Sequence, residues 1–302
     1  MKFISSKTIV SSSKITNPEN WFGYIYNMNI YRGCCHGCIY CDSRSECYQI
    51  KDFDVVAAKE NALQLIESEL KSKRTKGIIG TGAMSDPYNP FEKKQKLTRG
   101  ALKLIDKYGF GINLTTKSDL VTRDIDIIKN INTHSPASVG ITITTSDDEM
   151  ASKIEPNVVN SSKRFAALNE LSKNGIYTGI LMMPILPFIT DSEENIIAIV
   201  EKASEVGADF IYPSFGMTNR TGQKEYFYHC LDKYFPGIKE KYKTTFKDAY
   251  SCPSLNHKIL EKRFIEACED YHIKYKMKDI ICGTKNNVKQ KQISFFTTTQ
   301  PL

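Results

Sequence analysis

The sequence lacks the features that would place it in a membrane or outside the cell. No apolar run approaches the roughly 18 residues that a membrane-spanning helix needs. Residues 1–7 contain no apolar core of the kind that a signal peptide requires, so we expect a cytoplasmic protein. Without export, the nine cysteines are not expected to form a disulfide framework. We also find no internal repeat.

The remaining composition is typical of a globular protein. A chain of 302 residues with 41% hydrophobic content is long enough for one α/β barrel domain or two smaller domains, with a large core. The net charge of +7 and the pI of about 8.8 fit a polyanionic partner but do not require one. Lysines gather in several places, including residues 93–96, and each group also fits a solvated surface.

Three cysteines in one short segment carry the strongest chemical signal. Cys34, Cys38 and Cys41 have the spacing C-x-x-x-C-x-x-C. Thiolates are soft ligands for iron–sulfur clusters and for zinc. Three thiolates on a cluster of four irons leave one iron open to another ligand. A structural zinc site would instead need a fourth protein ligand, which His36 or Cys47 could supply.

Apolar strand-like segments alternate with amphipathic helical segments as far as residue 215. The predicted strands are 24–30, 77–80, 111–115, 138–144, 177–182 and 210–213. The predicted helices are 57–73, 98–107 with Thr98 as N-cap, 124–131, 161–173 and 192–206. Strands separated by helices predict a parallel sheet. Periodicity alone does not distinguish a partial barrel from a doubly wound sheet.

The alternation ends after residue 216. Residues 225–234 and 258–271 are predicted to be helical, and residues 273–277 to form a short strand. The polar residues from 283 onward are predicted to be a mobile tail. We therefore expect an N-terminal extension (1–21), a barrel (22–215), a C-terminal extension (216–285) and a tail (286–302).

The cysteine segment resembles that of the radical S-adenosylmethionine (SAM) superfamily. The resemblance rests on the cysteine spacing, on Tyr40 before the last cysteine and on the predicted strand before the loop. The wider strings Tyr31-Arg32-Gly33-Cys34 and Cys41-Asp42-Ser43-Arg44 resemble the branch that is like spore photoproduct lyase, or DNA repair photolyases. The resemblance implies a partial (β/α)6 barrel of the TIM type.

The same resemblance implies the cofactors. Cys34, Cys38 and Cys41 would bind a [4Fe-4S] cluster, whose open iron holds SAM and whose electron cleaves SAM to a 5′-deoxyadenosyl radical. A reductant such as flavodoxin or ferredoxin would supply that electron.

Further site residues follow the predicted strands, since chemistry in parallel barrels lies at the C-terminal strand ends. Ser85 and Asp86 match the branch's Ser-Asp-Pro-Tyr string near SAM, although a tight turn is the simpler interpretation. Lys117 matches a lysine that contacts the SAM carboxylate, and it could otherwise be a surface lysine. Thr142 stands where the lyases have a serine near SAM, and Arg164 is expected near the SAM carboxylate.

One departure concerns the substrate. Spore photoproduct lyases carry a hydrogen-donor cysteine in the loop after the second strand, whereas this loop has Ala83, Met84 and Ser85. Tyr40 and Tyr88 are the remaining hydrogen-donor candidates. We predict a radical SAM enzyme acting on nucleic acid, with a role in DNA repair. The alternatives are an enzyme modifying a peptide or small metabolite, and a non-catalytic binding module stabilised by a metal.

The last segment suggests one more partner. Gln292, Ile293, Ser294, Phe295 and Phe296 resemble the short peptide with which bacterial repair proteins bind the sliding clamp. A final strand, or an apolar patch folded back onto the barrel, is the alternative.

Overall fold

A computed structural model of the protein describes residues 1–13 and 21–296, with side chains as far as Val288. Among these residues the central sheet has seven strands, in the order β10-β9-β8-β7-β6-β3-β2. The strands are β2 (Val10–Ser12), β3 (Tyr24–Met28), β6 (Ile78–Thr81), β7 (Gly111–Thr116), β8 (Ala137–Thr142), β9 (Tyr177–Met182) and β10 (Phe210–Pro213). All neighbouring pairs are parallel except β2 with β3.

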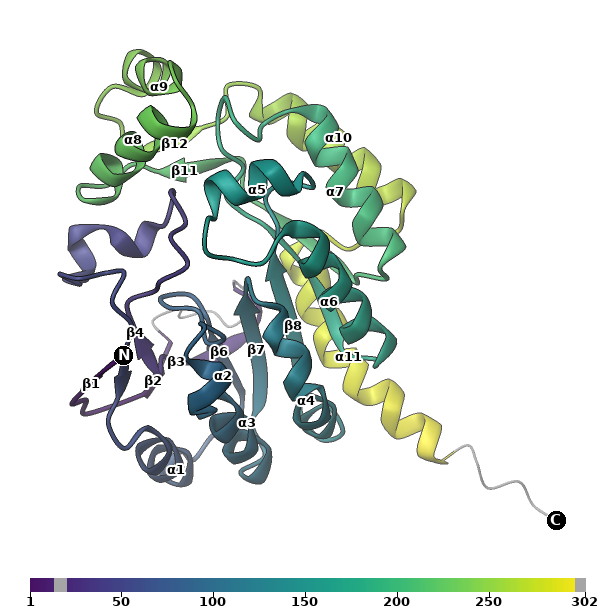
Figure 1. The fold of residues 1–302 in the computed structure, drawn as a ribbon. Helices are drawn as coiled ribbons and strands as arrows, with labels where there is room; N and C mark the ends of the chain where they lie inside the picture. Colours follow the sequence, from purple (N-terminus) through teal and green to yellow (C-terminus); the bar gives the residue numbers. More distant parts are fainter. Residues whose placement is uncertain (14–20, 297–302) are drawn as a thin grey trace.

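The strand order decides between the two predicted architectures. From β3 to β10 the strands follow one another in chain order, whereas a doubly wound sheet reverses direction part-way. In the described part of the chain, β10 and β2 remain unpaired edges and the barrel does not close. The fold is therefore an open, partial (β/α)6 barrel, as predicted (Figure 1).

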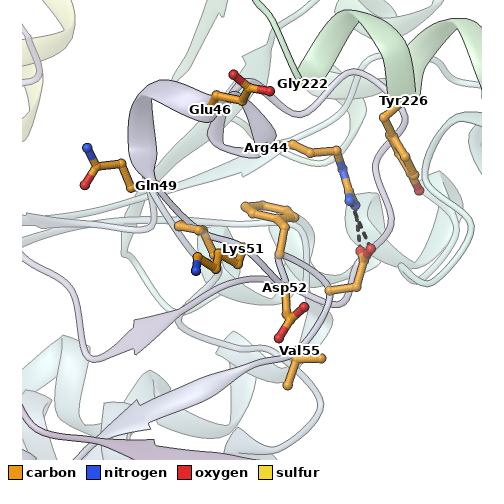
Figure 2. A pocket seen from close by; sticks show the side chains of 11 residues that line it. Arg44, Glu46, Gln49, Lys51, Asp52, Val55, Gly222 and Tyr226 are labelled. Carbon is orange, nitrogen blue, oxygen red and sulfur yellow. Dashed lines mark hydrogen bonds and ion pairs between the residues drawn. The ribbon is translucent and has the colours of Figure 1, made fainter.

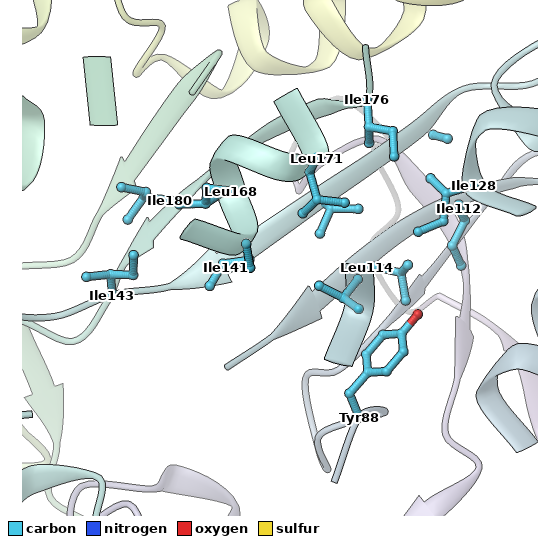
Figure 3. Packing of buried hydrophobic residues seen from close by; sticks show 14 of the residues in the cluster. Tyr88, Ile112, Leu114, Ile128, Ile141, Ile143, Leu168, Leu171, Ile176 and Ile180 are labelled. Atoms are coloured by element: carbon cyan, nitrogen blue, oxygen red, sulfur yellow. The ribbon is translucent and has the colours of Figure 1, made fainter. Parts of the chain in front are cut away.

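Helices follow most of the parallel strands and cover the outer face of the sheet (Figure 1). They are α1 (Ala62–Ser72), α2 (Glu92–Gln95), α3 (Leu97–Lys107), α4 (Ile125–Ile131), α5 (Asp148–Ile154), α6 (Ser161–Lys173) and α7 (Glu193–Glu205). Large apolar side chains on alternate strand positions, such as Ile112, Leu114 and Ile141, pack beneath Leu168 and Leu171 of α6 (Figure 3). This packing forms the main core.

The inner face of the sheet differs from the outer face. Near the N-terminal strand ends it carries the aromatic residues Tyr24, Tyr177 and Phe210, which pack against Ile280 of helix α11 (Met277–Phe296). Further along the strands it carries glycine, and a Cβ added to Gly80 would lie only 2.6 Å from the Tyr24 ring. The inside of the barrel is thus filled at one end and open at the C-terminal strand ends.

Two smaller units flank this sheet. The short strands β1 (Lys2–Ile4), β4 (Tyr31–Arg32) and β5 (Ala57–Lys59) form a separate sheet. Strands β11 (Gly216–Thr218) and β12 (Ser251–Pro253) pair around helices α8 (Gln223–Tyr234) and α9 (Ile238–Phe246). We call residues 216–253 the C-terminal module. Helix α10 (His257–Asp270) then packs against α7.

Several sequence predictions need correction. The predicted helix 57–73 divides into β5 and α1, because residues 57–59 pair with both β1 and β4. Thr98 is not an N-cap. It lies inside α3 and its hydroxyl donates to the carbonyl of Pro87, while the Glu92 carboxylate accepts from the Thr98 amide at 3.0 Å.

The C-terminal end also differs from the prediction. Residues 273–277 contribute only one isolated bridge to Phe210, and the expected tail is helical as far as Phe296. Buried Ile280, Thr284 and Val288 recur at helical spacing and hold α11 against the barrel. The proposed clamp-binding motif, residues 292–296, lies in this helix, and residues 297–302 lie outside the described residues. The sliding-clamp prediction is not supported, because these residues belong to a helix and not to a free tail.

None of the helices in residues 1–13 and 21–296 combines the length and the apolar character needed to cross a bilayer.

Candidate active site

The cysteine loop follows β4 and lies at the open end of the barrel. It begins at Gly33, whose φ of +74° is left-handed and whose added Cβ would lie 2.7 Å from the carbonyl oxygen of Phe53. The amide of Cys34 donates to that same carbonyl at 2.8 Å, and Ser85 Oγ donates to the Gly33 carbonyl at 2.5 Å. Glycine is required at this turn because a larger residue would be both strained and in collision with the backbone.

The three predicted cluster ligands come together in this loop. Cys38 is buried, and Cys34 and Cys41 are half-buried. Burial raises the pKa of Cys38 well above its usual value, and the neighbouring Cys41 and Cys34 raise it further. Burial likewise raises the pKa of Cys41, with Cys34 adding to the effect. Metal coordination would deprotonate these thiols.

The loop does not form a closed zinc site. Tetrahedral zinc would bring its sulfur ligands to about 3.8 Å from one another. In the described part of the chain no group of three or more His, Cys, Asp and Glu side chains is arranged to hold a single metal ion. His36 Nδ1 faces Asp86 at 3.5 Å, and exposed Cys47 lies 3.3 Å from Arg220 Nη1. A cubane cluster, whose ligands bind different irons, fits this spread of thiols better than one ion does.

A cavity of about 360 Å³ opens beside the cysteine loop, at the C-terminal strand ends. Its size lies at the lower end of the range for small-molecule sites. Three predicted site residues, Cys41, Lys117 and Thr142, line it together with the candidate hydrogen donor Tyr40. Most other polar lining side chains are neutral amides or hydroxyls: Asn27, Asn29, Ser43, Thr81, Asn113, Thr115, Ser214 and Thr218.

Lys117 and Asp42 are the charged residues among the described residues that line this cavity. The Lys117 side chain is half-buried, and its Nζ lies 5.7 Å from the centre of the Tyr40 ring. Burial alone would lower its pKa, but Cys38, Glu155 and Asp86 together raise the pKa of Lys117 above its usual value. Among the described residues its Nζ has no ion-pair partner within 4.0 Å. An ammonium held in this way can bind a carboxylate ligand.

Ser85 and Asp86 do not line the cavity, in contrast to the sequence prediction that they contact SAM. Asp86 is buried and accepts hydrogen bonds from Thr116 Oγ1 at 2.7 Å and from the Lys117 amide at 2.8 Å. Because Asp86 also faces His36, it connects the ends of β6 and β7 to the cysteine loop. Ser85 and Asp86 therefore position the loop and Lys117.

Arg164 also lies outside the cavity. It is buried on α6, where Nη1 donates to the Thr142 carbonyl at 3.0 Å and Nη2 lies 2.5 Å from Glu155 Oε2. Glu155 in turn accepts a hydrogen bond from the Tyr40 hydroxyl. This buried network fixes the end of β8 and the tyrosine before Cys41, so Arg164 acts on the site through its neighbours. Tyr88 lies in the main core and not in the cavity (Figure 3).

The C-terminal module supplies contacts that the sequence did not predict. Buried Gln223 of α8 donates from Nε2 to the Tyr40 carbonyl at 2.8 Å, and its Oε1 accepts from Thr218 Oγ1 at 3.0 Å. Thr218 Oγ1 also donates to Asp42 Oδ1 at 2.6 Å. Cys38, Ile39 and Tyr40 share one apolar cluster with this module.

Arg44 adds a second connection between the loop and the module. Its guanidinium lies over the Tyr226 ring at 3.6 Å and over the Phe53 ring at 4.7 Å, and it pairs with Asp54 at 2.6 Å (Figure 2). No local sequence pattern could reveal the contacts between the loop and the C-terminal module. Tyr40 and Gln223, and likewise Asp42 and Thr218, are more than 170 residues apart in the chain.

The comparison with protein families decides the assignment. Residues 28–209, more than half of the chain, match the family model of the radical SAM superfamily. The chain belongs to the radical SAM superfamily. The matched span contains the cysteine loop, Lys117, Thr142 and four of the six parallel strands in full, β6 to β9.

Named relatives and solved structures agree with this family. An uncharacterised protein of Methanocaldococcus jannaschii is 36% identical over 243 residues, covering 79% of this chain and 88% of its own length. A protein of a Pseudomonas phage, named a radical SAM Nalpha-GlyT isomerase, is 22% identical over 182 residues, covering 60% of this chain and 37% of its own. Spore photoproduct lyase, in complex with dinucleoside spore photoproduct, superposes with a TM-score of 0.62 at 14% identity, covering 89% and 79% of the two chains.

Radical SAM enzymes use a [4Fe-4S] cluster and SAM, so the predictions of an enzyme and of these cofactors are confirmed. The residues present fit both groups. Three thiols on one loop fit a cluster, and a cavity of mostly neutral polar groups that contains the Lys117 ammonium fits a ligand that carries a carboxylate. The structural likeness to the lyase, at this low identity, supports the fold only.

Proposed function

We propose that Cys34, Cys38 and Cys41 bind three irons of the cluster, that Lys117 and Thr142 hold SAM in the adjoining cavity, and that the enzyme acts on a nucleic acid. The observation that carries this proposal is the position of Lys117, an unpaired ammonium in the wall that also contains Cys41. When bound, the cluster and SAM supply a one-electron cleavage of SAM, which starts radical chemistry on the substrate.

The chain's own residues have three tasks in this proposal. Lys117 binds the carboxylate of SAM, and the positive φ of Gly82 lets the backbone approach the cavity, where an added Cβ would lie 1.9 Å from the Thr115 carbonyl oxygen. Asp86, Gln223 and Ser85 fix the cysteine loop. The apolar residues of the cavity exclude water from the reacting groups. A non-catalytic binding module would need no such cavity.

Two features favour a nucleic acid as substrate. The net charge of +7 favours binding to phosphate groups. Neutral amides, hydroxyls and the aromatic Trp21, Tyr24 and Tyr48 in the cavity walls suit an uncharged planar base. The proposal takes the same substrate class as the structurally similar lyase, which has been solved with a dinucleoside photoproduct bound.

The lyase reaction itself is not carried over to this chain. The loop after β6 has no cysteine. Tyr40 lines the cavity, but its hydroxyl donates to Glu155, and the Tyr88 side chain lies in the core. Neither tyrosine is placed to give a hydrogen atom to a product. The proposal therefore names nucleic acid, with a role in DNA repair, as the substrate class, and it names no particular lesion.

The proposal is tested by anaerobic reconstitution and chromatography for 5′-deoxyadenosine. We expect the product to form slowly without substrate and faster with one member of a panel of irradiated DNA, undamaged DNA, RNA and peptides. Iron-loaded protein that forms no 5′-deoxyadenosine would contradict the enzyme assignment. Stimulation by peptides alone would contradict the nucleic-acid substrate.

A more specific prediction concerns Lys117. Lys117→Ala should weaken SAM binding by about 1.5–3 kcal/mol, because a hydrogen bond to a charged group is lost. Equilibrium titration of the reconstituted protein with SAM gives the change, and the iron content should stay normal. Lys103→Ala, an exposed lysine on α3, is the control. Equal affinity of wild type and Lys117→Ala would place SAM elsewhere.

Salt dependence tests the nucleic-acid proposal separately. Binding of DNA or RNA should weaken steeply as salt rises, because phosphate contacts release counterions. The slope of log K against log salt, measured by fluorescence anisotropy, gives the number of phosphate contacts. A flat slope, or no binding at low salt, would favour the peptide or metabolite alternative.

A further inference from the structure

A second cleft, of about 400 Å³, opens on the other side of Lys117 from the SAM cavity. Lys117 is the one described residue that lines both. The walls of this cleft come from the cysteine loop, from the segment around α2 and from residues 157–159, and they include His36, Pro90, Lys93, Asn157 and Val158. Apart from Lys117, none of the described residues that line this cleft is assigned to the binding of SAM or substrate.

The cleft reaches the cluster ligands through His36. The imidazole is buried and forms part of the cleft wall. His36 lies two residues after Cys34, and its backbone carbonyl accepts a hydrogen bond from the Asn157 amide at 3.1 Å. The Asn157 side chain also donates to the Cys35 carbonyl at 3.0 Å. One wall of the cleft is thus built from the loop that carries the proposed cluster ligands.

The rim of the cleft is positively charged around an apolar patch. Lys93 and Lys94 are exposed, and neither forms an ion pair with any described residue. Lys93 and exposed Pro90 line the cleft, and Phe91, which is 36% accessible, lies next to Pro90 in the chain. Asp119 is the one acidic side chain among the described lining residues. An apolar centre with a cationic rim is complementary to an acidic protein surface.

We propose that this cleft is the docking surface for an acidic one-electron carrier protein, of the flavodoxin kind, that reduces the cluster. The proposal rests on the cluster assignment made above. The step moves one electron and no atoms: the reduced flavin of the carrier loses the electron and the oxidised cluster gains it. The substrate enters through the SAM cavity, whose described lining shares only Lys117 with this cleft, so both partners can bind at once.

The test is the rate at which a reduced acidic flavodoxin bleaches the cluster, measured anaerobically by stopped-flow absorbance. The variant carrying both Lys93→Glu and Lys94→Glu should react at least about tenfold more slowly at low ionic strength, and the difference should shrink as salt rises. The control carries Lys258→Glu and Lys278→Glu, two exposed and unpaired lysines on α10 and α11 with the same total change in charge. It should react like wild type.

Two further measurements separate docking from the cluster itself. Affinity of the cluster-free protein for oxidised flavodoxin, measured by titration, should fall in the Lys93→Glu, Lys94→Glu variant and not in the control. Photoreduced deazaflavin, a small reductant that needs no docking surface, should bleach the cluster equally in all three proteins. A protein without a bleachable cluster would instead contradict the proposed function.

Other outcomes would overturn the docking proposal. If the Lys93→Glu, Lys94→Glu variant and the control variant bound flavodoxin equally tightly and were reduced by it equally fast, the cleft would have no role in docking. Loss of affinity for a DNA oligonucleotide in the Lys93→Glu, Lys94→Glu variant, with an unchanged flavodoxin rate, would assign the lysines to the substrate.

Discussion

Replacing Cys34, Cys38 or Cys41 with alanine is expected to abolish cluster binding. Each thiol supplies one of only three protein bonds to the cluster. Anaerobically purified wild type should show the broad visible absorbance of thiolate-to-iron charge transfer, bleached on reduction. Each variant should lack this absorbance and contain little iron, and none should cleave SAM.

Cys35 and Cys47 provide matched controls for this experiment. Cys35 is half-buried in the same loop, and Cys47 is exposed six residues after Cys41. Alanine at either position should leave iron content and absorbance unchanged. Zinc in place of iron in the anaerobic preparation would contradict the cluster assignment. Loss of the cluster in Cys35→Ala would show that the three ligands are not the ones assigned here.

Arg164→Met should produce the largest loss of folding stability among the substitutions considered. Arg164 and Glu155 are each only 1% exposed, and removing one partner leaves a buried charge without compensation. Such a change costs about 3–5 kcal/mol of unfolding free energy. Urea unfolding of the metal-free protein, followed by circular dichroism, measures the loss. Lys163→Met, an exposed neighbour on the same helix, is the control.

The stability loss should depend on pH with a definite sign. Burial would raise the pKa of Glu155, but the charges of Arg164 and Lys117 hold it below its usual value in the wild type. That stabilisation is present above the pKa of unfolded Glu155 and is lost as pH falls through the folded pKa. Without Arg164, burial should raise the pKa of Glu155, which favours its protonated form.

The difference between wild type and Arg164→Met should therefore be larger near pH 7 than near pH 5. A difference in unfolding free energy that stays constant between these values would show that Glu155 is not the group left unpaired. Arg164→Lys, which keeps the charge, should recover part of the loss at pH 7.

The fold could be predicted where a periodic pattern was long enough. Helix α6 and strands β9 and β10 agree with the predicted residues at both ends, because each has a full buried face and a clear turn or cap after it. Strand β5 has three residues and no period of its own, and only its pairing with β1 and β4 makes it a strand. The sequence of helix α11 is largely polar, and for this reason it was wrongly predicted to be a tail.

The candidate site divides in the same way. The cysteine spacing and the predicted strand ends singled out Cys41, Lys117 and Thr142, which line one cavity. Ser85, Asp86 and Arg164 were predicted to contact SAM, but they point into hydrogen-bond networks behind the cavity. A strand-end motif indicates nearness to the site, whereas the direction of each side chain depends on neighbours that are distant in sequence.

The contact between Gln223 and the cysteine loop has a consequence for the order of events during synthesis. The carbonyl that Gln223 binds belongs to Tyr40, 183 residues earlier in the chain. The apolar residues that cover the loop, from Met217 to Cys252, also emerge from the ribosome after the barrel strands. The cysteines are thus made early and enclosed late. Iron delivery is expected to succeed only after residue 253 has been synthesised, so a truncated chain that ends with β10 should fold its sheet yet fail to retain iron.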